Sequence, residues 1–336
     1  MADRVLVTGG SGFLAEWQIV KLLRAGYNVR ATLRDLARAD EVRTAVAREI
    51  AHADRVGFVN ADLTCDGGWE EAVNGCSFVL HIASPFPIAQ PDNPDDLIVP
   101  ARDGVLRILR AAVKRVVMTS SSSALSDPAG RRPVPLTEAH WTDPDARGTT
   151  PYVKSKVLSE RAAWDYMKAH GGDTEFAVIA PTAIIGPALS RDLSASVHGV
   201  RRLLIGDMPG IPRLGFPFVD VRDIADLQLL AMTRREAVGE RIAGAGRFMW
   251  LADAAAVLRQ HLGEAAAKVP TRTVPSILIR MMSLRDPGLR SVVRALDRER
   301  VVSSEKAHRL LGWMARPAEE SLIDCARSLS ALGLAP

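Results

Sequence analysis

The sequence predicts an α/β protein built on a doubly wound parallel sheet, with a smaller, mainly helical lobe toward the carboxyl end. Three observations support this prediction. A short apolar strand pattern opens the chain and leads directly into a glycine-rich turn and an amphipathic helix. Strand-like and helix-like segments then alternate up to about residue 182, which is typical of parallel α/β folds. From Gly186 onward, this alternation gives way to a proline-rich stretch and then to mostly helical sequence.

The glycine-rich turn follows the predicted strand 5–7 and leads into a helix that begins near Phe13. Gly9 and Gly10 permit backbone angles that a side chain forbids, and Gly12 lets the backbone approach a bound anion closely. The N–H groups at the start of the helix face that anion, so the turn suits a pyrophosphate. Because strand, turn and helix occur in this order, we interpret the segment as a dinucleotide site rather than a plain glycine loop.

The end of the second predicted strand, residues 28–33, decides which dinucleotide is preferred. An acidic residue at this point would bind the ribose 2′-hydroxyl of NAD(H), but the chain has Arg34 there, followed by Arg38. A guanidinium suits the additional 2′-phosphate of NADP(H). We therefore expect NADP(H) in preference to NAD(H); the alternative is that Arg34 is a solvated surface residue.

The rest of the sheet is predicted from short apolar runs separated by helices. We expect helices over 40–53 and 97–112, and strands over 56–59, 77–82 and 115–119. The strand ends offer further cofactor contacts, namely Asp62 for the adenine amino group and the small residues Ala83 and Ser84. His81 lies inside an apolar strand, which favours a hydrogen-bonded core residue over a catalytic acid or base.

At 336 residues, the chain is longer than one average domain. We expect a dinucleotide-binding domain over 1–185, to which 216–250 returns. A substrate-binding lobe would comprise 186–215 and 251–336, with a strand over 218–221 and a helix over 222–233 inside the returning segment.

Composition excludes several classes of protein. There is no run of about twenty apolar residues, and the first strand begins too early to leave room for a signal peptide, so we expect a cytoplasmic protein without a membrane partner. The formal charge of +4 comes from scattered arginines, which argues against nucleic-acid binding. The three cysteines lack metal-ligand spacing, and we expect no metal site.

Tyr152 and Lys156 are four residues apart in a segment predicted to be helical through Lys168, so both side chains project from the same face. A nearby ammonium favours the phenolate of a tyrosine, whose pKa is otherwise about 10. The serine run 120–123 follows the strand 115–119 at its carboxyl end, where ligands bind in such sheets. Each motif alone also fits a surface helix or a polar loop, but together with the glycine turn they indicate an acid–base site.

These motifs resemble the extended short-chain dehydrogenases/reductases, and within them the group of dihydroflavonol reductases, cinnamoyl-CoA reductases and microbial carbonyl reductases. The resemblance rests on TGGSGFLA at 8–15, VLHIASP at 79–85, TSS at 119–121, YVKSK at 152–156, APTAIIGP at 180–187 and FVDVRDIADL at 218–227. It spans nearly the whole chain and implies a Rossmann fold. It also implies catalytic roles for Ser121, with Ser122 as a substitute, and for Tyr152 and Lys156.

The resemblance implies hydride transfer between a nicotinamide and a carbonyl carbon. Ser121 would hold the carbonyl oxygen, Tyr152 would protonate it, and Lys156 would keep the pKa of the tyrosine low while holding the nicotinamide ribose. Arg34 falls on the family's 2′-phosphate arginine, whereas the lysine that often assists it is here Glu41. The expected cofactor contacts are Thr8, Gly9, Gly12, Phe13, Leu14, Arg34, Asp62, Leu63, Ala83, Ser84, Thr119, Lys156, Pro181, Thr182 and Ile184.

The expected substrate is a small-molecule aldehyde or ketone with a hydrophobic or aromatic body. Neither plant reaction is indicated, because the substrate-contacting asparagine of the flavonoid enzymes is replaced by Ser126 and the cinnamoyl-CoA signature before the lysine is absent. The apolar pocket would run over 85–86, 184–189 and 208–212. The expected substrate contacts are Pro85, Ser122, Ser126, Tyr152 and Met208.

Two other functions are compatible with the sequence. A sugar-nucleotide epimerase or dehydratase shares the fold and the Tyr/Lys pair, but it would prefer NAD, against Arg34. A non-catalytic, cofactor-sensing regulator of the same fold usually lacks the tyrosine, against Tyr152. The resemblance implies a monomer or a homodimer, and the sequence does not decide between them.

Overall fold

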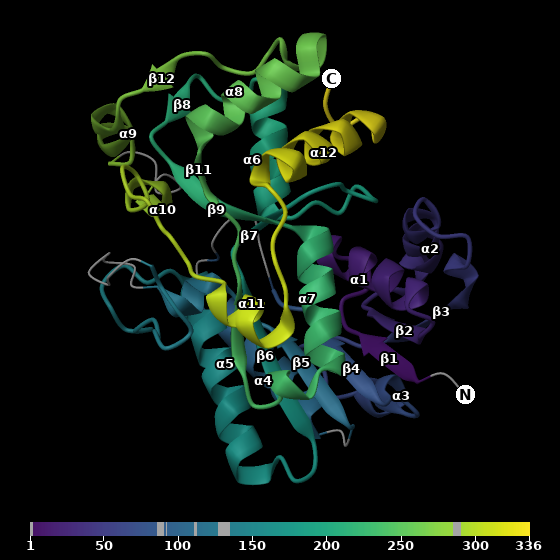
Figure 1. The fold of residues 1–336 in the computed structure, drawn as a ribbon. Coiled ribbons are helices and arrows are strands. Elements are labelled where there is room, and N and C mark those ends of the chain that lie inside the picture. Colours follow the sequence, from purple (N-terminus) through teal and green to yellow (C-terminus); the bar gives the residue numbers. More distant parts are fainter. Residues whose placement is uncertain (1–2, 86–90, 92, 111–112, 127–134, 285–289) are drawn as a thin grey trace.

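The parallel sheet predicted from the sequence is present in a computed structural model, which describes residues 3–85, 91, 93–110, 113–126, 135–284 and 290–336 (Figure 1). All neighbouring strands pair in parallel, in the order β10-β6-β5-β4-β1-β2-β3. The strands are β1 (Arg4–Val7), β2 (Asn28–Leu33), β3 (Val56–Asn60), β4 (Phe78–His81), β5 (Arg115–Thr119), β6 (Glu175–Pro181) and β10 (Arg241–Gly244). The chain reverses its winding direction between β1 and β4, so the opening turn lies at the point where this sheet type binds its ligand.

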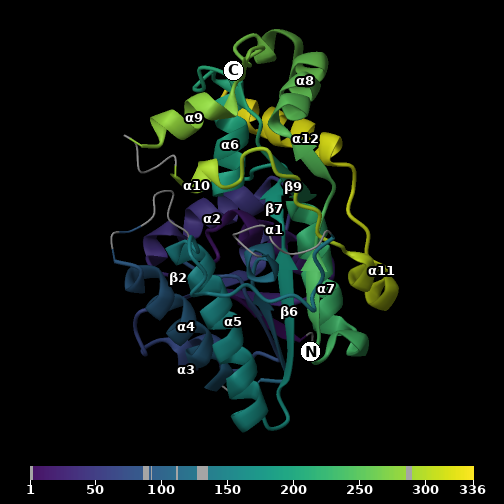
Figure 2. The same ribbon diagram turned by 90° about the vertical axis from the view of Figure 1, so that its left-hand side faces the viewer.

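Helices cover both faces of the sheet (Figures 1 and 2). One face carries α1 (Phe13–Arg24), α2 (Ala39–Ala47) and α7 (Val221–Thr233). The other carries α3 (Trp69–Val73), α4 (Asp95–Arg110) and α5 (Pro151–His170). Two separate clusters of buried apolar side chains fill the space between the sheet and these two helical layers. Because strand residues point alternately to opposite faces, Val5 and Val7 enter one cluster and Leu6 the other. The predicted fold class is confirmed.

Three local predictions were incomplete. The helix expected over 40–53 ends at Ala47, because residues 48–52 turn the chain back toward β3. The short helix α3 was not predicted. A third helix, α6 (Ala195–Leu204), occupies a stretch for which no secondary structure was predicted. Its buried Val197, Val200 and Leu204 have helical spacing, and Ser194 caps its first turn.

The remaining elements form a second group beyond the carboxyl edge of the sheet. A three-stranded sheet joins β7 (Ala183–Ile185), β9 (Gly215–Asp220) and β11 (Phe248–Trp250), and a two-stranded one joins β8 (Ile211–Pro212) and β12 (Thr273–Val274). In Figures 1 and 2, these strands lie with α6, α8 (Leu251–Leu262), α9 (Ser276–Met282), α10 (Arg290–Val293) and α12 (Ala318–Ala331) above the parallel sheet. Helix α11 (Glu305–Leu311) packs against α7 and β10 instead. The division into two domains at the expected boundaries stays a prediction.

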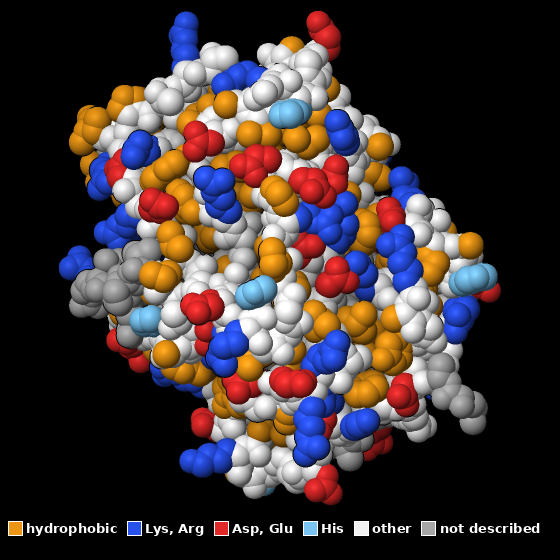
Figure 3. Space-filling model, in the orientation of Figure 1, with side chains coloured by type: hydrophobic (Ala, Val, Ile, Leu, Met, Phe, Trp, Pro, Cys, Tyr) orange, Lys and Arg blue, Asp and Glu red, His pale blue; other side chains and the backbone are white. Residues whose placement is uncertain are grey.

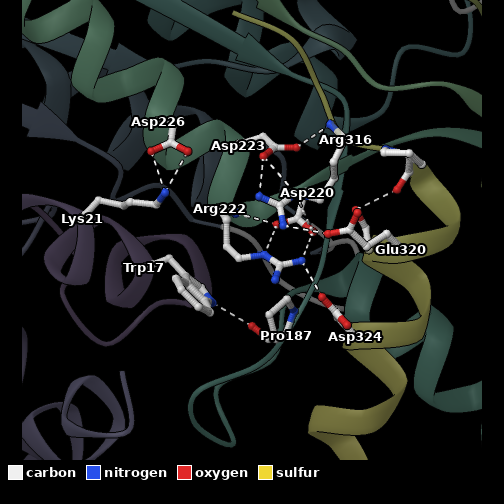
Figure 4. A network of polar contacts seen from close by, with 12 residues as sticks. Trp17, Lys21, Pro187, Asp220, Arg222, Asp223, Asp226, Arg316, Glu320 and Asp324 are labelled. Carbon is white, nitrogen blue, oxygen red and sulfur yellow. Dashed lines mark hydrogen bonds and ion pairs between the residues drawn. The ribbon is translucent and has the colours of Figure 1, made fainter. Parts of the chain in front are cut away.

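A polar network fastens α12 to the central helices (Figure 4). Asp220 is fully buried at the end of β9 and accepts hydrogen bonds from the Arg222 guanidinium, which also reaches Asp324 of α12 at 2.8 Å. Arg316, just before α12, binds Asp223 of α7 at 2.8 Å. Asp220 and Asp223 are buried and paired, so together with Asp324 they fix the C-terminal helix against the body of the protein.

The surface carries charges of both signs. On the face shown in Figure 3, lysine, arginine and acidic side chains are interspersed rather than gathered into a single basic area. None of the helices in the described part of the chain combines the length and apolar composition needed to cross a membrane.

Candidate active site

The glycine turn is held in place by the end of β2. The N–H of Gly9 donates to Thr32 Oγ1 at 2.9 Å, and the N–H of Gly10 donates to the Thr32 carbonyl at 2.8 Å. Gly9 has a φ of +70°, a conformation that favours glycine. The reason given for Gly10 was wrong, because its φ is not positive; the constraint is space, since a Cβ there would lie 2.7 Å from Ala31 Cβ.

The turn fits a dinucleotide. Gly12 is the N-cap of α1 and offers no side-chain hydrogen bond, so it leaves the N–H groups of the first helical turn available to an anion. Ser11 in the turn accepts a hydrogen bond from Arg38 at 3.1 Å, which brings a guanidinium to the edge of the same site. The residues therefore offer both backbone donors and a cation to a phosphate-bearing cofactor.

Arg34 and Arg38 differ in their surroundings. Arg34 is exposed directly after β2. Arg38 forms ion pairs with Glu41 at 2.9 Å and with Asp192 at 3.2 Å. Glu41, which takes the place of the lysine that the resemblance led us to expect, is thus bound to Arg38, and this hydrogen bonding lowers the pKa of Glu41. The negative charge of Glu41 near the glycine turn is therefore balanced by the guanidinium of Arg38.

Thr8 joins the turn to β4. Its hydroxyl accepts hydrogen bonds from the N–H groups of Ile82 and Ala83 at 3.0 Å and lies 2.9 Å from Nδ1 of His81. His81 is 3% exposed, and its pKa is lowered to about 3 by burial, with a smaller effect of the Lys156 charge. A neutral, hydrogen-bonded histidine of this kind agrees with its interpretation as a core residue.

The predicted catalytic residues come together at the carboxyl ends of β5 and β6. Thr150 caps α5 by accepting from the N–H of Val153 at 3.3 Å, which places Tyr152 in the first helical turn. Ser121 caps the short helical turn that follows β5, and its hydroxyl accepts from the N–H of Ser123 at 3.2 Å. The Ser121 hydroxyl is near enough to the Tyr152 phenol to lower its pKa, and Ser123 acts in the same direction. Of the two serines proposed from the sequence, Ser121 is therefore the one that meets the phenol.

The pKa of Tyr152 differs from the expectation. Burial raises it, and hydrogen bonding to Ser121 and Ser123 only partly opposes this effect. Lys156 does not lower the pKa of Tyr152, contrary to what had been expected from the sequence. Lys156 is 6% exposed, and its own pKa falls to about 8 because of burial, although the charge of Glu160 acts to raise it. Its Nζ lies 3.5 Å from the Thr119 carbonyl.

A buried ion pair supports this face of α5 and was not predicted. Glu160 follows Lys156 by one helical turn, is fully buried, and accepts from Ser120 Oγ at 2.5 Å. Its partner is Arg241 of β10, whose Nε lies 2.5 Å from Oε1 of Glu160. The guanidinium also stacks 3.6 Å above the ring of Trp141. The four-residue spacing from Lys156 was a signal for Glu160, whereas Arg241 is distant in sequence.

One cavity of about 390 Å³ holds the candidate site. It brings together these predicted residues: Leu14, Ser84, Thr119, Ser121, Ser122, Ser126, Tyr152, Lys156, Pro181, Thr182 and Ile184. Pro85 and Met208 were predicted substrate contacts, but neither lines this cavity; Met208 packs against the hydrophobic core instead. Phe86 lies outside the described residues.

The remaining predicted cofactor contacts lie beyond this cavity. Thr8, Gly9, Gly12 and Phe13 form the turn and the start of α1, and Ala83 lies against Gly9. Asp62 accepts hydrogen bonds from the N–H and the hydroxyl of Thr64 at 2.7 Å, which lower its pKa. Leu63 packs closely over Gly104. The structure adds lining residues that the sequence did not indicate, among them Phe216 and Pro217 of β9 and Arg298 and Arg300 near the carboxyl end.

Comparison with known proteins assigns the chain to a family. The family model described as the NAD dependent epimerase/dehydratase family matches residues 5–243. Dihydroflavonol 4-reductase of Zea mays is 33% identical over 249 residues, which are 71% of this chain and 69% of that protein. Cinnamoyl-CoA reductase CAD2 of Medicago truncatula is 36% identical over 248 residues, or 71% of this chain and 75% of that protein.

Solved structures show the same fold. Yeast methylglyoxal/isovaleraldehyde reductase Gre2, complexed with NADPH, superposes with a TM-score of 0.81 at 24% identity, covering 98% of this chain and 99% of that one.

Proposed function

We propose that the protein reduces an aldehyde or ketone to an alcohol with NADPH. The chain belongs to the NAD dependent epimerase/dehydratase family. It is an oxidoreductase of the extended short-chain dehydrogenase/reductase type. The observation that carries the proposal is that Tyr152, Ser121 and Lys156 line one cavity with Leu14 and Ser84, next to the glycine turn. A proton donor and a nicotinamide site therefore adjoin, as carbonyl reduction requires.

Tyr152 is the proposed general acid. Its raised pKa keeps the phenol protonated at neutral pH, which is the state that can donate a proton to a carbonyl oxygen. Ser121 reaches the same phenol and is placed to donate a hydrogen bond to that oxygen. The reduced nicotinamide, when bound, supplies the hydride.

Lys156 supports the acid after the proton has left. With a pKa of about 8, its ammonium is mainly charged at neutral pH and can stabilise the phenolate one helical turn away. The same charge is available to hold the hydroxyl groups of a nicotinamide ribose. Burial of the site strengthens both interactions, because little water competes for these groups.

The preference for NADPH follows from the end of β2. Arg34 is exposed where an enzyme selective for NAD(H) would place an acid, and Arg38 lies close by with Ser11 of the turn. Both guanidiniums can contact a 2′-phosphate. Glu41 does not cancel this preference, because Arg38 retains donors beyond those it gives to the acid.

The substrate is proposed to have a hydrophobic or aromatic body. Apolar side chains line the cavity together with the polar groups of β5 and α5, among them Leu136, Phe216, Pro217 and Val302. Small-molecule pockets of this size bind most of their ligand through such apolar surface. The similarity to dihydroflavonol and cinnamoyl-CoA reductases supports an aromatic carbonyl compound as the first choice.

The test is a panel of carbonyl compounds. Purified protein is mixed with NADPH or NADH and with aromatic aldehydes, ketones, ketoesters or nucleotide sugars, and the loss of reduced-nicotinamide absorbance is followed. Oxidation of NADPH with aldehydes or ketones is expected. Turnover of nucleotide sugars alone would contradict the proposal and favour an epimerase or dehydratase. Cofactor binding without any turnover would favour a regulator.

A further inference from the structure

Two arginines near the carboxyl end, Arg298 and Arg300, line the same cavity as Tyr152 and Lys156. Every charged side chain in the described lining is a cation, and no aspartate or glutamate is among them. Burial lowers the pKa of Arg300, and the positive charge of Arg298 acts in the same direction. Because arginine stays protonated in proteins, the cavity carries concentrated positive charge.

Elsewhere in this protein, a buried arginine comes with an acid. The buried Arg241 meets the buried Glu160, and the buried Arg115 meets Glu175 at 2.6 Å. Within the part of the chain that the structure describes, the two cavity guanidiniums have no carboxylate partner of this kind. Arg298 is exposed and Arg300 is half-buried, so the uncompensated charge of Arg300 is partly removed from water, and an anionic ligand in contact with both would bind here favourably.

The segment that carries the two arginines is fixed at both ends. Before it, the N–H of Asp297 donates to the Arg213 carbonyl at 2.9 Å, and Asp297 has a φ of 62°. After it, the N–H of Leu136 donates to the Val301 carbonyl at 2.9 Å, and the N–H of Ser303 donates back to Leu136 at 2.8 Å. The arginines are therefore held at the cavity wall rather than carried by a loose loop, which reduces the entropy lost on ligand binding.

We propose that Arg298 and Arg300 bind an anionic group of the carbonyl substrate, a carboxylate or a phosphate, so that the enzyme prefers acidic aldehydes or ketones to neutral ones. The inference rests on the reductase function proposed above. A guanidinium pair can receive such a group through several parallel N–H donors. Leu136 and Phe216 hold the apolar body of the substrate, and Tyr152 meets its carbonyl oxygen.

The arginines are less suited to the phosphates of the cofactor. Those phosphates are provided for at the glycine turn and at Arg34 and Arg38, none of which lines this cavity. Arg298 and Arg300 come instead from the segment that faces Phe216 and the serines of the catalytic site. The two possibilities make different kinetic predictions.

The experiment compares three aldehydes that share one aromatic body. The kcat/KM values of 4-carboxybenzaldehyde, 4-formylphenyl phosphate and methyl 4-formylbenzoate are measured with NADPH for the wild type, Arg298→Gln, Arg300→Gln and the double variant. Arg309→Gln is the matched control, because Arg309 is exposed on α11 and does not line the cavity. Unfolding midpoints show that each variant is folded, and Arg300→Lys, which keeps the charge, should retain part of the preference.

The wild type should have a higher kcat/KM for at least one anionic aldehyde than for the ester. The anionic aldehyde with the higher kcat/KM shows whether the site binds a carboxylate or a phosphate. Each single glutamine variant should lose about ten- to a hundredfold in kcat/KM for that anion, as expected for a lost charge-assisted hydrogen bond. The rate with the ester, the KM for NADPH and the control variant should be nearly unchanged. Equal kcat/KM values of the wild type for all three aldehydes would overturn the proposal. So would a loss of kcat/KM in the glutamine variants that is the same for all three aldehydes. A raised KM for NADPH as the main effect would assign the arginines to the cofactor and also overturn it.

A binding experiment separates this inference from the reductase function. If no aldehyde is reduced, the proposed function fails, and calorimetry with 4-carboxybenzyl alcohol and 4-(hydroxymethyl)benzamide on the NADPH-loaded protein still tests the arginines. Tighter binding of the acid than of the amide, lost in the double variant, would support the anion site. Equal binding of the two compounds would contradict it.

Discussion

Replacing Arg241 by methionine should destabilise the protein by about 3–5 kcal/mol, the usual cost of breaking a buried ion pair on one side. Glu160 is fully buried, and Arg241 approaches its two oxygens at 2.5 and 3.2 Å. Without the guanidinium, the carboxylate keeps two hydrogen-bond donors among the described residues, Ser120 at 2.5 Å and Trp164 at 3.4 Å, and the charge of Lys156 one helical turn away. These groups make no ion pair with it to replace the one that Arg241 provides.

The structure places the expected loss toward the upper part of that range. The Arg241 guanidinium also donates to the backbone carbonyls of Ala124, Glu138 and His140 at 2.7 to 3.1 Å. Each buried carbonyl that loses its donor adds about 1 kcal/mol or more. Methionine fills much of the space of the arginine stem, so a cavity contributes little to the loss.

The assay is urea unfolding of the wild type, Arg241→Met, Glu160→Leu and the double variant. The double variant removes both charges, so it should be more stable than the sum of the two single losses predicts. A loss below about 1 kcal/mol for Arg241→Met, a value typical of exposed pairs, would refute the reasoning. Strictly additive single losses would show that the two groups are not coupled.

Three further predictions concern the titration of the site and the choice of cofactor. Glu160→Gln should move the alkaline limit of the kcat/KM profile to lower pH. Charged Lys156 is present only below its pKa of about 8, and Glu160 raises that pKa; an unchanged profile would contradict this role. Because burial lowers the pKa of Lys156 from 10.5 to about 8, the unfolded state binds more protons between these values. The free energy of unfolding of the wild type should therefore rise from pH 8 to 10.5 by up to about 3 kcal/mol more than that of Lys156→Met. The same pH dependence of unfolding in both proteins would contradict this prediction. Replacing Arg34 and Arg38 together by glutamine should raise the KM for NADPH about tenfold or more and leave that for NADH little changed, whereas equal effects on both would assign these residues another role.

Much of the fold could be predicted because its signals are local. The apolar runs of the strands and the turn around Gly9 lie within single short segments, and their order along the chain specifies a parallel sheet. Helix α6 was not predicted although Val197 and Val200 carry its periodicity, because the stretch is short and lies between the alternating segments and the proline-rich piece. The end of α2 at Ala47 depends on how the chain returns to β3, which is a tertiary property.

The site was predictable in its sequence-local part. Tyr152 and Lys156 share a helix face by their spacing, and Ser121 follows a strand end, where ligands bind in a parallel sheet. Arg241 and Arg300 are far from the other site residues in the sequence, and no short sequence motif predicts that they lie at the site. The raised pKa of Tyr152 was missed because burial depends on the surrounding elements and not on the helical spacing.

The central claim is that Tyr152 gives the proton while the glycine turn holds the cofactor. Its most direct test is Tyr152→Phe, measured for NADPH affinity by fluorescence titration and for aldehyde reduction under single-turnover conditions. The account predicts nearly unchanged NADPH binding and a loss of about 10²- to 10⁴-fold in the rate of reduction. A variant that binds NADPH and reduces the aldehyde at close to the wild-type rate would contradict it.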